Sequence, residues 1–65
     1  MKIDVWKVRE LIATRQMKMS DMADAANLSS TNLAKVLHRG TCRLSTGGRI
    51  AAALGVNIRE IWIEE

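Results

Sequence analysis

Apolar and small residues recur at helical spacing on both sides of one polar turn in the middle of the chain. Residues three or four apart stack along one face of a helix, so each set forms an apolar stripe. The stripes comprise Met22, Ala23 and Ala26 before the turn, Leu28 within it, and Leu33 and Val36 after it. The pattern predicts a helix, a tight turn and a second helix, an arrangement with which many proteins read DNA.

The turn residues have the chemistry that this arrangement needs. Asn27 suits a residue that leaves the first helix at positive φ, which Asn tolerates better than most non-glycine residues. Leu28 can fill the corner, and Ser29 can cap the second helix. Ala23 is expected where the two helices cross, because a larger side chain there would push them apart.

Capping and turn residues divide the rest of the chain into further short helices. Asp4 is a good N-cap, Gly40 and Gly55 are typical helix ends, and a loop is expected from Thr41 to Leu44. The first expected helix runs from Asp4 to about Arg15 and buries a stripe formed by Val5, Val8, Leu11 and Ile12. The other expected helices run from Ser20 to Ala26, from Ser30 to His38 or Arg39, from Ser45 to Leu54, and from Asn57 to the chain end. The sequence therefore predicts an all-α, compact five-helix domain over residues 1–65.

Two consecutive glycines, Gly47 and Gly48, interrupt the expected fourth helix. A glycine inside a helix costs up to about 1 kcal/mol relative to alanine. Either the helix begins only at Arg49, or a neighbouring backbone packs too closely for a side chain. A phosphate-binding loop is disfavoured because the glycine spacing and the lysine of such loops are missing.

Composition narrows the class of protein. Hydrophobic residues make up 48% of the 65 residues, and Phe and Tyr are absent, so the core must be aliphatic. No apolar run approaches the roughly 20 residues needed to span a bilayer, and no signal-peptide pattern is visible. The single Cys42 cannot form an internal disulfide, which agrees with a reducing compartment. We therefore expect a soluble, cytoplasmic protein.

Charge is distributed unevenly along the chain, whose net charge is +3. Acidic residues are absent between Ala25 and Arg59. The cations of this stretch are Lys35, Arg39, Arg43, Arg49 and Arg59. Such a stretch indicates a polyanionic partner, although a merely solvated basic surface has the same composition. Because it contains the second helix of the turn motif, we expect double-stranded DNA to be the partner.

The polar side of that second helix carries candidate DNA contacts. With the apolar stripe buried, a step of about 100° per residue places Thr31, Lys35 and His38 on the opposite side. Hydroxyl groups can contact base edges or phosphates, and lysine can donate to guanine or to phosphate. Each residue has a structural alternative: Ser29 can be only a helix cap, and Lys35 and His38 can be only solvated surface residues.

Several segments together resemble the Cro/repressor helix-turn-helix family, also called Xre-like. Met22-Ala23, Leu28-Ser29 and Leu33–Val36 are similar to the family's second helix, turn and recognition helix. Arg49–Val56, with the sequence RIAAALGV, is similar to the segment that closes the family's domain. The resemblance covers nearly the whole chain. It implies a five-helix, lambda-repressor-like domain whose third helix lies in the major groove of DNA.

The resemblance also implies roles for individual residues. The base-reading positions are Ser30, Thr31 and Lys35, and the expected DNA-backbone contacts are Lys18, Ser29, His38, Arg39 and Arg43. The chain departs from the family at Lys18 and Met19, where Ser and Gln are usual. Met19 cannot hydrogen-bond to phosphate or base, whereas Lys18 can supply a different contact. Leu37 stands where a polar residue is common, which leaves an apolar group at the edge of the recognition helix.

Catalytic and metal chemistry find little support. His38 and Cys42 lie four residues apart, but a zinc site normally needs three or four ligands. With one histidine no Ser–His–acid set is credible. Cys42 beside Arg43 can have a somewhat reactive thiolate, but a lone cysteine in a loop is more often incidental. Trp6 is expected in the core or at an interface. We expect a protein that is not an enzyme and that uses no cofactor and no metal.

Repression of transcription by occupying a promoter is the function that these observations favour. The alternatives are a protein-interaction module such as an antitoxin or adaptor, supported by Leu37, Trp62 and Ile63, and an excision or architectural factor of a mobile element. Small binders of this type usually pair on half-sites one DNA turn apart. Ile58, Ile61 and Trp62 at helical spacing are expected in the core. Ile63, with the edge of Trp62, is assigned to a weak homodimer contact on DNA.

Overall fold

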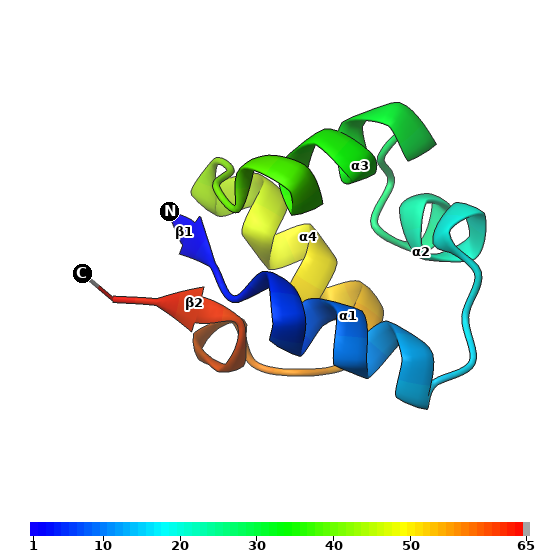
Figure 1. Cartoon of the computed structure of the whole chain (residues 1–65), viewed down its shortest axis with the longest axis horizontal. Helices are drawn as coiled ribbons and strands as arrows, with labels where there is room; N and C mark the ends of the chain where they lie inside the picture. Colours follow the sequence, from blue (N-terminus) through cyan, green and yellow to red (C-terminus); the bar gives the residue numbers. More distant parts are fainter. Residues whose placement is uncertain (65) are drawn as a thin grey trace.

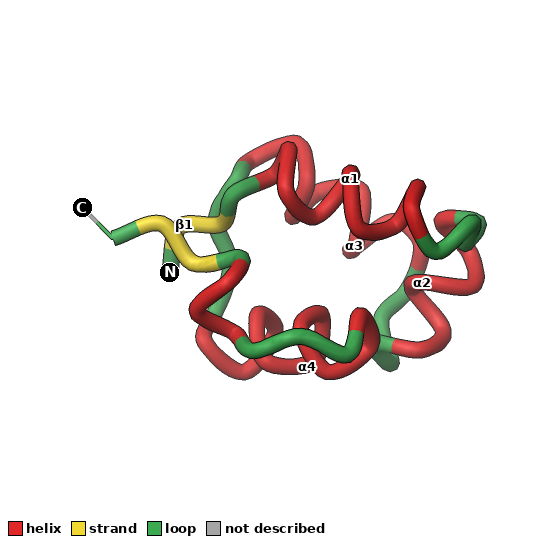
Figure 2. Tube along the Cα trace, turned by 90° about the horizontal axis from the view of Figure 1, so that it is seen from below, coloured by secondary structure: helices red, strands yellow, loops and turns green. Residues whose placement is uncertain are grey.

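Four α-helices make up most of the computed structural model, which describes residues 1–64 (Figure 1). They are α1 (Val5–Thr14), α2 (Met19–Ala25), α3 (Ser30–Arg39) and α4 (Leu44–Leu54). A single 3-10 turn, η1 (Ile58–Glu60), and two short strands, β1 (Lys2–Ile3) and β2 (Trp62–Ile63), complete the described part. Figure 2 shows α1 and α3 on one side of the molecule and α4 on the other, with α2 closing one end.

The predicted helix-turn-helix is present in α2 and α3. Asn27 has a φ of 56°, as its position in the turn predicted. The Leu28 amide donates to the Ala23 carbonyl at 2.8 Å, and Leu28 packs against the core at the corner. Ala23 is fully buried, and α2 packs on both α3 and α4. The small side chain at this position therefore lets three helices approach one another.

The predicted helix caps are mostly confirmed. Asp4 Oδ1 accepts a hydrogen bond from the Lys7 amide at 3.0 Å and caps α1. Gly40 and Gly55 end α3 and α4 at φ values of 75° and 70°, a region that favours glycine. These caps fix where α1 begins and where α3 and α4 end.

The core is aliphatic, as the composition predicted. Its buried residues lie on β1, on the four α-helices and next to them: Ile3, Val8, Ile12, Met22, Ala23, Ala26, Leu33, Leu37, Ile50, Ala51 and Leu54. One further buried residue, Ile61, lies between η1 and β2. The expected pairing of Leu33 with Val36 is half right. Leu33 is fully buried, whereas Val36 is half-buried at the side of α3. Leu37, four residues after Leu33, shares its face and is only 3% exposed, so the expectation of an apolar edge at Leu37 was wrong.

Two helices begin earlier than predicted. The expected start of α2 was Ser20, but the helix begins at Met19 with Lys18 as N-cap, whose amide donates to Asp21 Oδ2 at 3.4 Å. The expected cap of α4 was Ser45, but α4 begins at Leu44 and has Arg43 as N-cap with no side-chain hydrogen bond. A serine in the first turn can be an ordinary helical residue when a later carboxylate or water satisfies the free amides.

Gly47 and Gly48 lie inside α4, so the helix does not start at Arg49. A Cβ placed on Gly47 would collide with the Met1 sulfur, whereas a Cβ on Gly48 would meet no atom within 4 Å. The second sequence interpretation is therefore right about crowding at Gly47 and wrong about its source. The close neighbour is the side chain of Met1, not a backbone segment.

The predicted fifth helix is wrong. Asn57 does begin a helical turn, because its Oδ1 accepts from the Arg59 amide at 2.9 Å. The turn ends at Glu60, and β2 then pairs antiparallel with β1, in the register Lys2 with Ile63 and Ile3 with Trp62. Pairing with a strand from the far end of the chain satisfies the backbone here, so the domain is mostly helical with a two-stranded ribbon. Glu65, the last residue of the expected helix, lies outside the described residues.

Both tryptophans lie outside the core, which leaves the interface as the remaining expectation for Trp6. Trp6 is 81% exposed on α1 and takes no part in the core. Trp62 lies on a strand and is partly exposed, as is Ile63, while Ile61 is fully buried. Within residues 1–64, the helices are too short to cross a membrane.

Candidate nucleic-acid interface

The exposed face of α3 carries the three residues that the sequence predicted for reading bases. Ser30, Thr31 and Lys35 are all exposed. At the start of this helix, Ser29 Oγ accepts a hydrogen bond from the Asn32 amide at 3.0 Å. The Ser29 hydroxyl proton remains free to donate to a phosphate, so capping and DNA contact are compatible. The beginning of α3 is thus open and equipped with hydroxyl groups.

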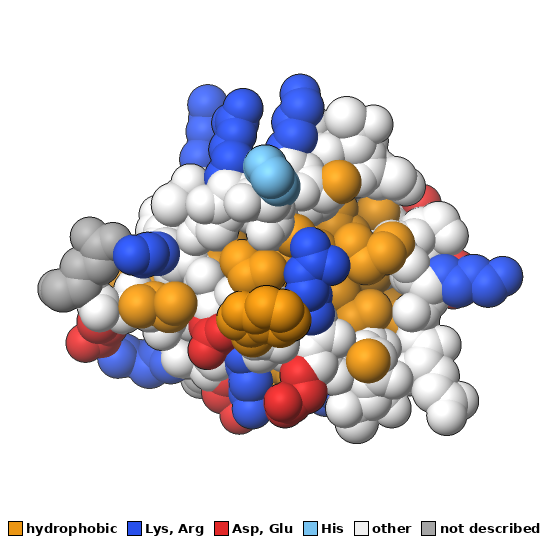
Figure 3. Space-filling model, viewed as in Figure 1, with side chains coloured by type: hydrophobic (Ala, Val, Ile, Leu, Met, Phe, Trp, Pro, Cys, Tyr) orange, Lys and Arg blue, Asp and Glu red, His pale blue; other side chains and the backbone are white. Residues whose placement is uncertain are grey.

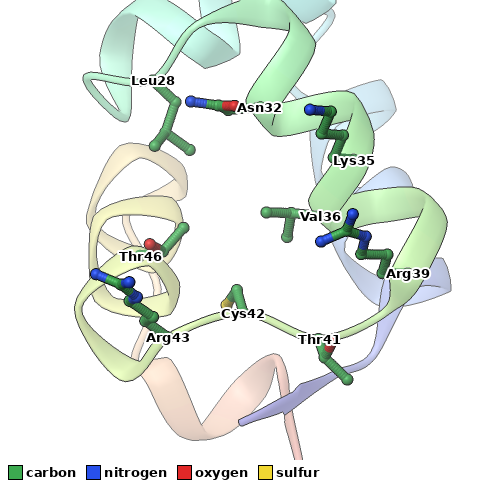
Figure 4. A pocket seen from close by; sticks show the side chains of 9 residues that line it. All are labelled: Leu28, Asn32, Lys35, Val36, Arg39, Thr41, Cys42, Arg43 and Thr46. Carbon is green, nitrogen blue, oxygen red and sulfur yellow. The ribbon is translucent and has the colours of Figure 1, made fainter.

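A hollow of about 230 Å³ lies between α3 and the beginning of α4 (Figure 4). We call it the α3–α4 hollow; it is lined by Leu28, Asn32, Lys35, Val36, Arg39, Thr41, Cys42, Arg43 and Thr46. Figure 4 shows Lys35 and Arg39 on the α3 side and Arg43 on the α4 side, with Val36 pointing toward the space between them. A concave surface with cations on both rims can accept a phosphate group.

Carboxylates do not offset these cations. Within residues 1–64, none of the three cations Lys35, Arg39 and Arg43 forms an ion pair. Arg59, by contrast, approaches Glu64 with an Nη1–Oε1 distance of 3.8 Å. Figure 3 shows Lys and Arg side chains projecting from the edge over α3, beside the single histidine, and most visible acidic side chains toward the opposite edge. The α3 edge therefore presents an uncompensated positive charge.

The structure separates the remaining predicted contacts from this hollow. His38 and Thr31 are exposed on the other side of α3, where they line a second hollow. Lys18 is exposed at the cap of α2 and lines neither hollow. Trp62 and Ile63, which the sequence assigned to a dimer contact, form strand β2 of the ribbon. The predicted contact residues thus cluster around α3, whereas Lys18 and the pair Trp62 and Ile63 lie apart from this cluster.

Two polar residues of the hollow were not predicted as contacts. Asn32 was not assigned a contact, yet its side chain lines the hollow. Thr46 lies on the first turn of α4 and faces the same space. The helical step already places Asn32 next to Lys35 and Val36, so the signal for Asn32 was available. Thr46 could be found only by knowing that α4 begins at Leu44.

Cys42 does not behave as the sequence suggested. Burial raises the pKa of the Cys42 thiol, and the nearby N-terminal ammonium and a backbone hydrogen bond at Gly47 only partly oppose this shift. The interpretation of a reactive thiolate beside Arg43 is therefore wrong, because the thiol stays protonated to higher pH than a free cysteine. The Met1 amine donates to the Cys42 carbonyl at 2.7 Å, and the Cys42 amide donates to the Met1 carbonyl at 3.0 Å.

Comparison with known protein families identifies the kind of domain that carries this surface. The family model for the Cro/C1-type helix-turn-helix DNA-binding domain matches residues 7–63. The chain belongs to this family. As a Cro/C1-type domain it is a DNA-binding protein with a role in regulating transcription, and domains of this family are typically non-enzymatic. In two other comparisons, the chain matches no curated protein and no solved structure.

The match agrees with the geometry. It includes all four α-helices except for the first two residues of α1, and it extends to the end of β2. The α2–α3 pair and the α3–α4 hollow therefore lie wholly inside the Cro/C1-type domain.

Proposed function

We propose that this Cro/C1-type domain recognises a specific double-stranded DNA sequence by placing α3 in the major groove, and that it represses transcription by occupying a promoter. One observation carries the proposal: the exposed face of α3 adjoins a hollow rimmed by three cations that pair with no carboxylate within residues 1–64. We take the whole chain, residues 1–65, as the DNA-binding domain.

In this proposal Ser30, Thr31 and Lys35 read base edges. Ser30 and Thr31 lie in the first turn of α3, the end that enters the groove first in units of this kind. Lys35 lies one turn further along the same face. It lines both hollows beside α3, so its ammonium can reach into the groove from the middle of the helix.

The backbone contacts are assigned to the groups around this face. Arg39 and Arg43 hold one phosphate between them across the α3–α4 hollow. Ser29 and His38 contact phosphates at the two ends of α3, and Lys18 does so from the cap of α2. Such contacts fix the register of the helix on the duplex, whereas base contacts supply the specificity.

Selection of bound sites from a random duplex pool, followed by titration of the variants, tests the assignment. Lys35→Ala should relax preference at particular base pairs by about 1–3 kcal/mol. Arg43→Ala should weaken binding to all sequences alike and flatten the salt dependence by about one phosphate contact. Arg59→Ala is the matched control, because Arg59 is exposed but already lies near Glu64.

Two results would contradict the assignment. If Lys35→Ala weakens every sequence equally, the lysine is a phosphate contact and base reading lies elsewhere. If Arg43→Ala and Arg59→Ala have the same small effect, the α3–α4 hollow does not hold a phosphate.

We further propose that two copies pair weakly on DNA through Trp62 and Ile63. Both side chains are partly exposed on β2. The edge of β2 that does not face β1 can pair with the same strand of a second copy. So small a contact should be weak in free solution and strengthened when one operator holds both copies.

A further inference from the structure

A second concave surface lies on the other side of α3, between α3 and α1. Two adjoining hollows of about 630 and 550 Å³ share Arg9, Leu37, His38 and Arg39, so they form one continuous groove. We call it the α1–α3 groove. Its apolar residues are Val5, Trp6, Met19, Ala34 and Leu37. Figure 3 faces this groove and shows hydrophobic side chains gathered in the middle of the face, between the two helices.

Trp6 is the most conspicuous member of the groove. It is 81% exposed on α1, and Met19 is 39% exposed on α2. Leu37 reaches the groove from the core and forms part of its floor. Exposed tryptophan and methionine are both enriched at protein-binding surfaces, because each buries a large area on contact.

The charge of the groove is one-signed. Arg9 stands on the α1 side, and Lys35, His38 and Arg39 stand on the α3 side. Among residues 1–64, no carboxylate lines either hollow. A partner that covers the apolar floor must therefore be acidic at its edges to match this rim.

We propose that the α1–α3 groove binds an acidic amphipathic helix of a partner protein. The apolar stripe of such a helix would lie on Trp6, Met19 and Leu37, and its flanking carboxylates would face Arg9 and Arg39. Helices that dock in grooves supply this pattern of apolar anchors with charged flanks.

A second copy of the chain does not fit the groove. The large exposed hydrophobic residues of the described part are Trp6, Met19, Leu44, Trp62 and Ile63. Trp6, Met19 and Leu44 lie on three different helices, and the other two lie on a strand. The domain thus offers no helix with an exposed apolar stripe among residues 1–64.

Occupancy of the groove should compete with DNA, a consequence that rests on the proposed function. Lys35 and Arg39 line both the α1–α3 groove and the α3–α4 hollow. Thr31 and His38 also line the groove while belonging to the proposed DNA face. A carboxylate-bearing helix that engages these side chains removes them from the duplex. The acidic helix therefore acts as a competitive inhibitor of DNA binding.

Display selection against the full chain tests the groove without using DNA. The probe is a phage library of random peptides of about 16 residues, long enough for a marginally stable helix. Selected peptides should be acidic, with apolar residues at helical spacing. In a Trp62→Phe background Trp6 is the single tryptophan, so binding should shift its emission to shorter wavelength as the ring is buried.

Variants locate the binding site. Trp6→Ala and Arg9→Glu should each weaken peptide binding by about tenfold or more. Arg15→Glu, on the same helix but outside both hollows, is the matched control and should leave binding unchanged. Because Trp6 and Arg9 are exposed, these variants should keep the native circular dichroism spectrum.

The outcomes separate the possibilities. Selected peptides that lack acidic residues, or that bind Trp6→Ala and Arg9→Glu as tightly as the parent, overturn the groove proposal. Trp6 emission that shifts with protein concentration alone assigns the groove to a second copy and also overturns it. Peptide that binds the groove but leaves DNA bound overturns the competition. Peptide binding by a chain that binds no duplex refutes the proposed function and leaves the docking site standing.

Discussion

The two glycines inside α4 should respond differently to the same substitution. Gly47 and Gly48 are the fourth and fifth residues of this helix, and neither has positive φ. Alanine in a helix interior is favoured over glycine by about 0.5–1 kcal/mol, because glycine loses more backbone freedom on folding. At Gly48 the added Cβ meets nothing within 4 Å, so Gly48→Ala should gain this amount in full.

Gly47→Ala should not gain it. The added Cβ would collide with the Met1 sulfur, would lie 3.0 Å from the Met1 methyl carbon and would lie 3.6 Å from Cys42 Sγ. Met1 packs against the core, so moving its side chain aside gives up apolar contact. The crowded atoms are the flexible end of the Met1 side chain, so the cost of moving them is modest and offsets the gain in helix propensity rather than far exceeding it. We expect Gly47→Ala to be less stable than Gly48→Ala by up to about 1 kcal/mol.

Chemical and thermal denaturation followed by circular dichroism measure the difference. In a domain of this size about 1 kcal/mol corresponds to a shift of roughly 4–8 °C in Tm. Gly48→Ala should raise Tm, and Gly47→Ala should leave it unchanged or lower it. Equal stabilisation of both variants would show that Met1 does not pack on α4 and would refute the reasoning.

Three further expectations concern the core, the thiol and assembly. Leu33→Ala should lower the free energy of unfolding by about 2–5 kcal/mol in urea titration, because Leu33 is fully buried; the volume-conserving Leu33→Met should cost under about 1.5 kcal/mol. The raised pKa of Cys42 should make iodoacetamide react more slowly with the folded chain than with the denatured chain at pH 8. As pH rises past the usual thiol pKa, the unfolded state loses its proton first, so stability should fall, and Cys42→Ser should abolish that fall. Ile63→Asp should reduce formation of a two-to-one complex on a palindromic site in sedimentation while the folded spectrum is kept; a two-to-one complex that survives unchanged removes Ile63 from the interface.

Local sequence signals predicted the parts of the fold that local contacts determine. Asn27 at positive φ, Ser29 as N-cap, and Gly40 and Gly55 as helix ends are each decided by the backbone within a few residues. The stripe that contains Leu33 was also correct, because one residue on a short helix fixes the approximate buried direction. It was wrong in placing Val36 rather than Leu37 on the buried side, since both lie within one helical step of that direction.

The errors occur where distant segments decide. The pattern around Ile58 and Ile61 fits a helix locally, but β1 from the other end of the chain offers hydrogen bonds that a helix would forfeit. The collision at Gly47 depends on Met1, and the raised thiol pKa of Cys42 depends on burial. The α1–α3 groove likewise needs the relative placement of two helices, so the sequence indicated Trp6 as an interface candidate without its surroundings.

The unpredicted ribbon also bears on the proposed DNA surface. The Ile3 amide donates to the Gly40 carbonyl at 2.8 Å, and Lys2 forms a bridge with Thr41. The chain between α3 and α4 is therefore held at several points by the segment that precedes α1. This connection joins Arg39, at the end of α3, to Arg43, at the cap of α4. If these two arginines share a phosphate, their spacing is set by strand pairing at the ends of the chain as well as by the helix-turn-helix itself. The same strand pairing holds α3 between the α3–α4 hollow and the α1–α3 groove, both of which carry cations. A ligand bound in the hollow and a ligand bound in the groove therefore contact side chains of the same helix.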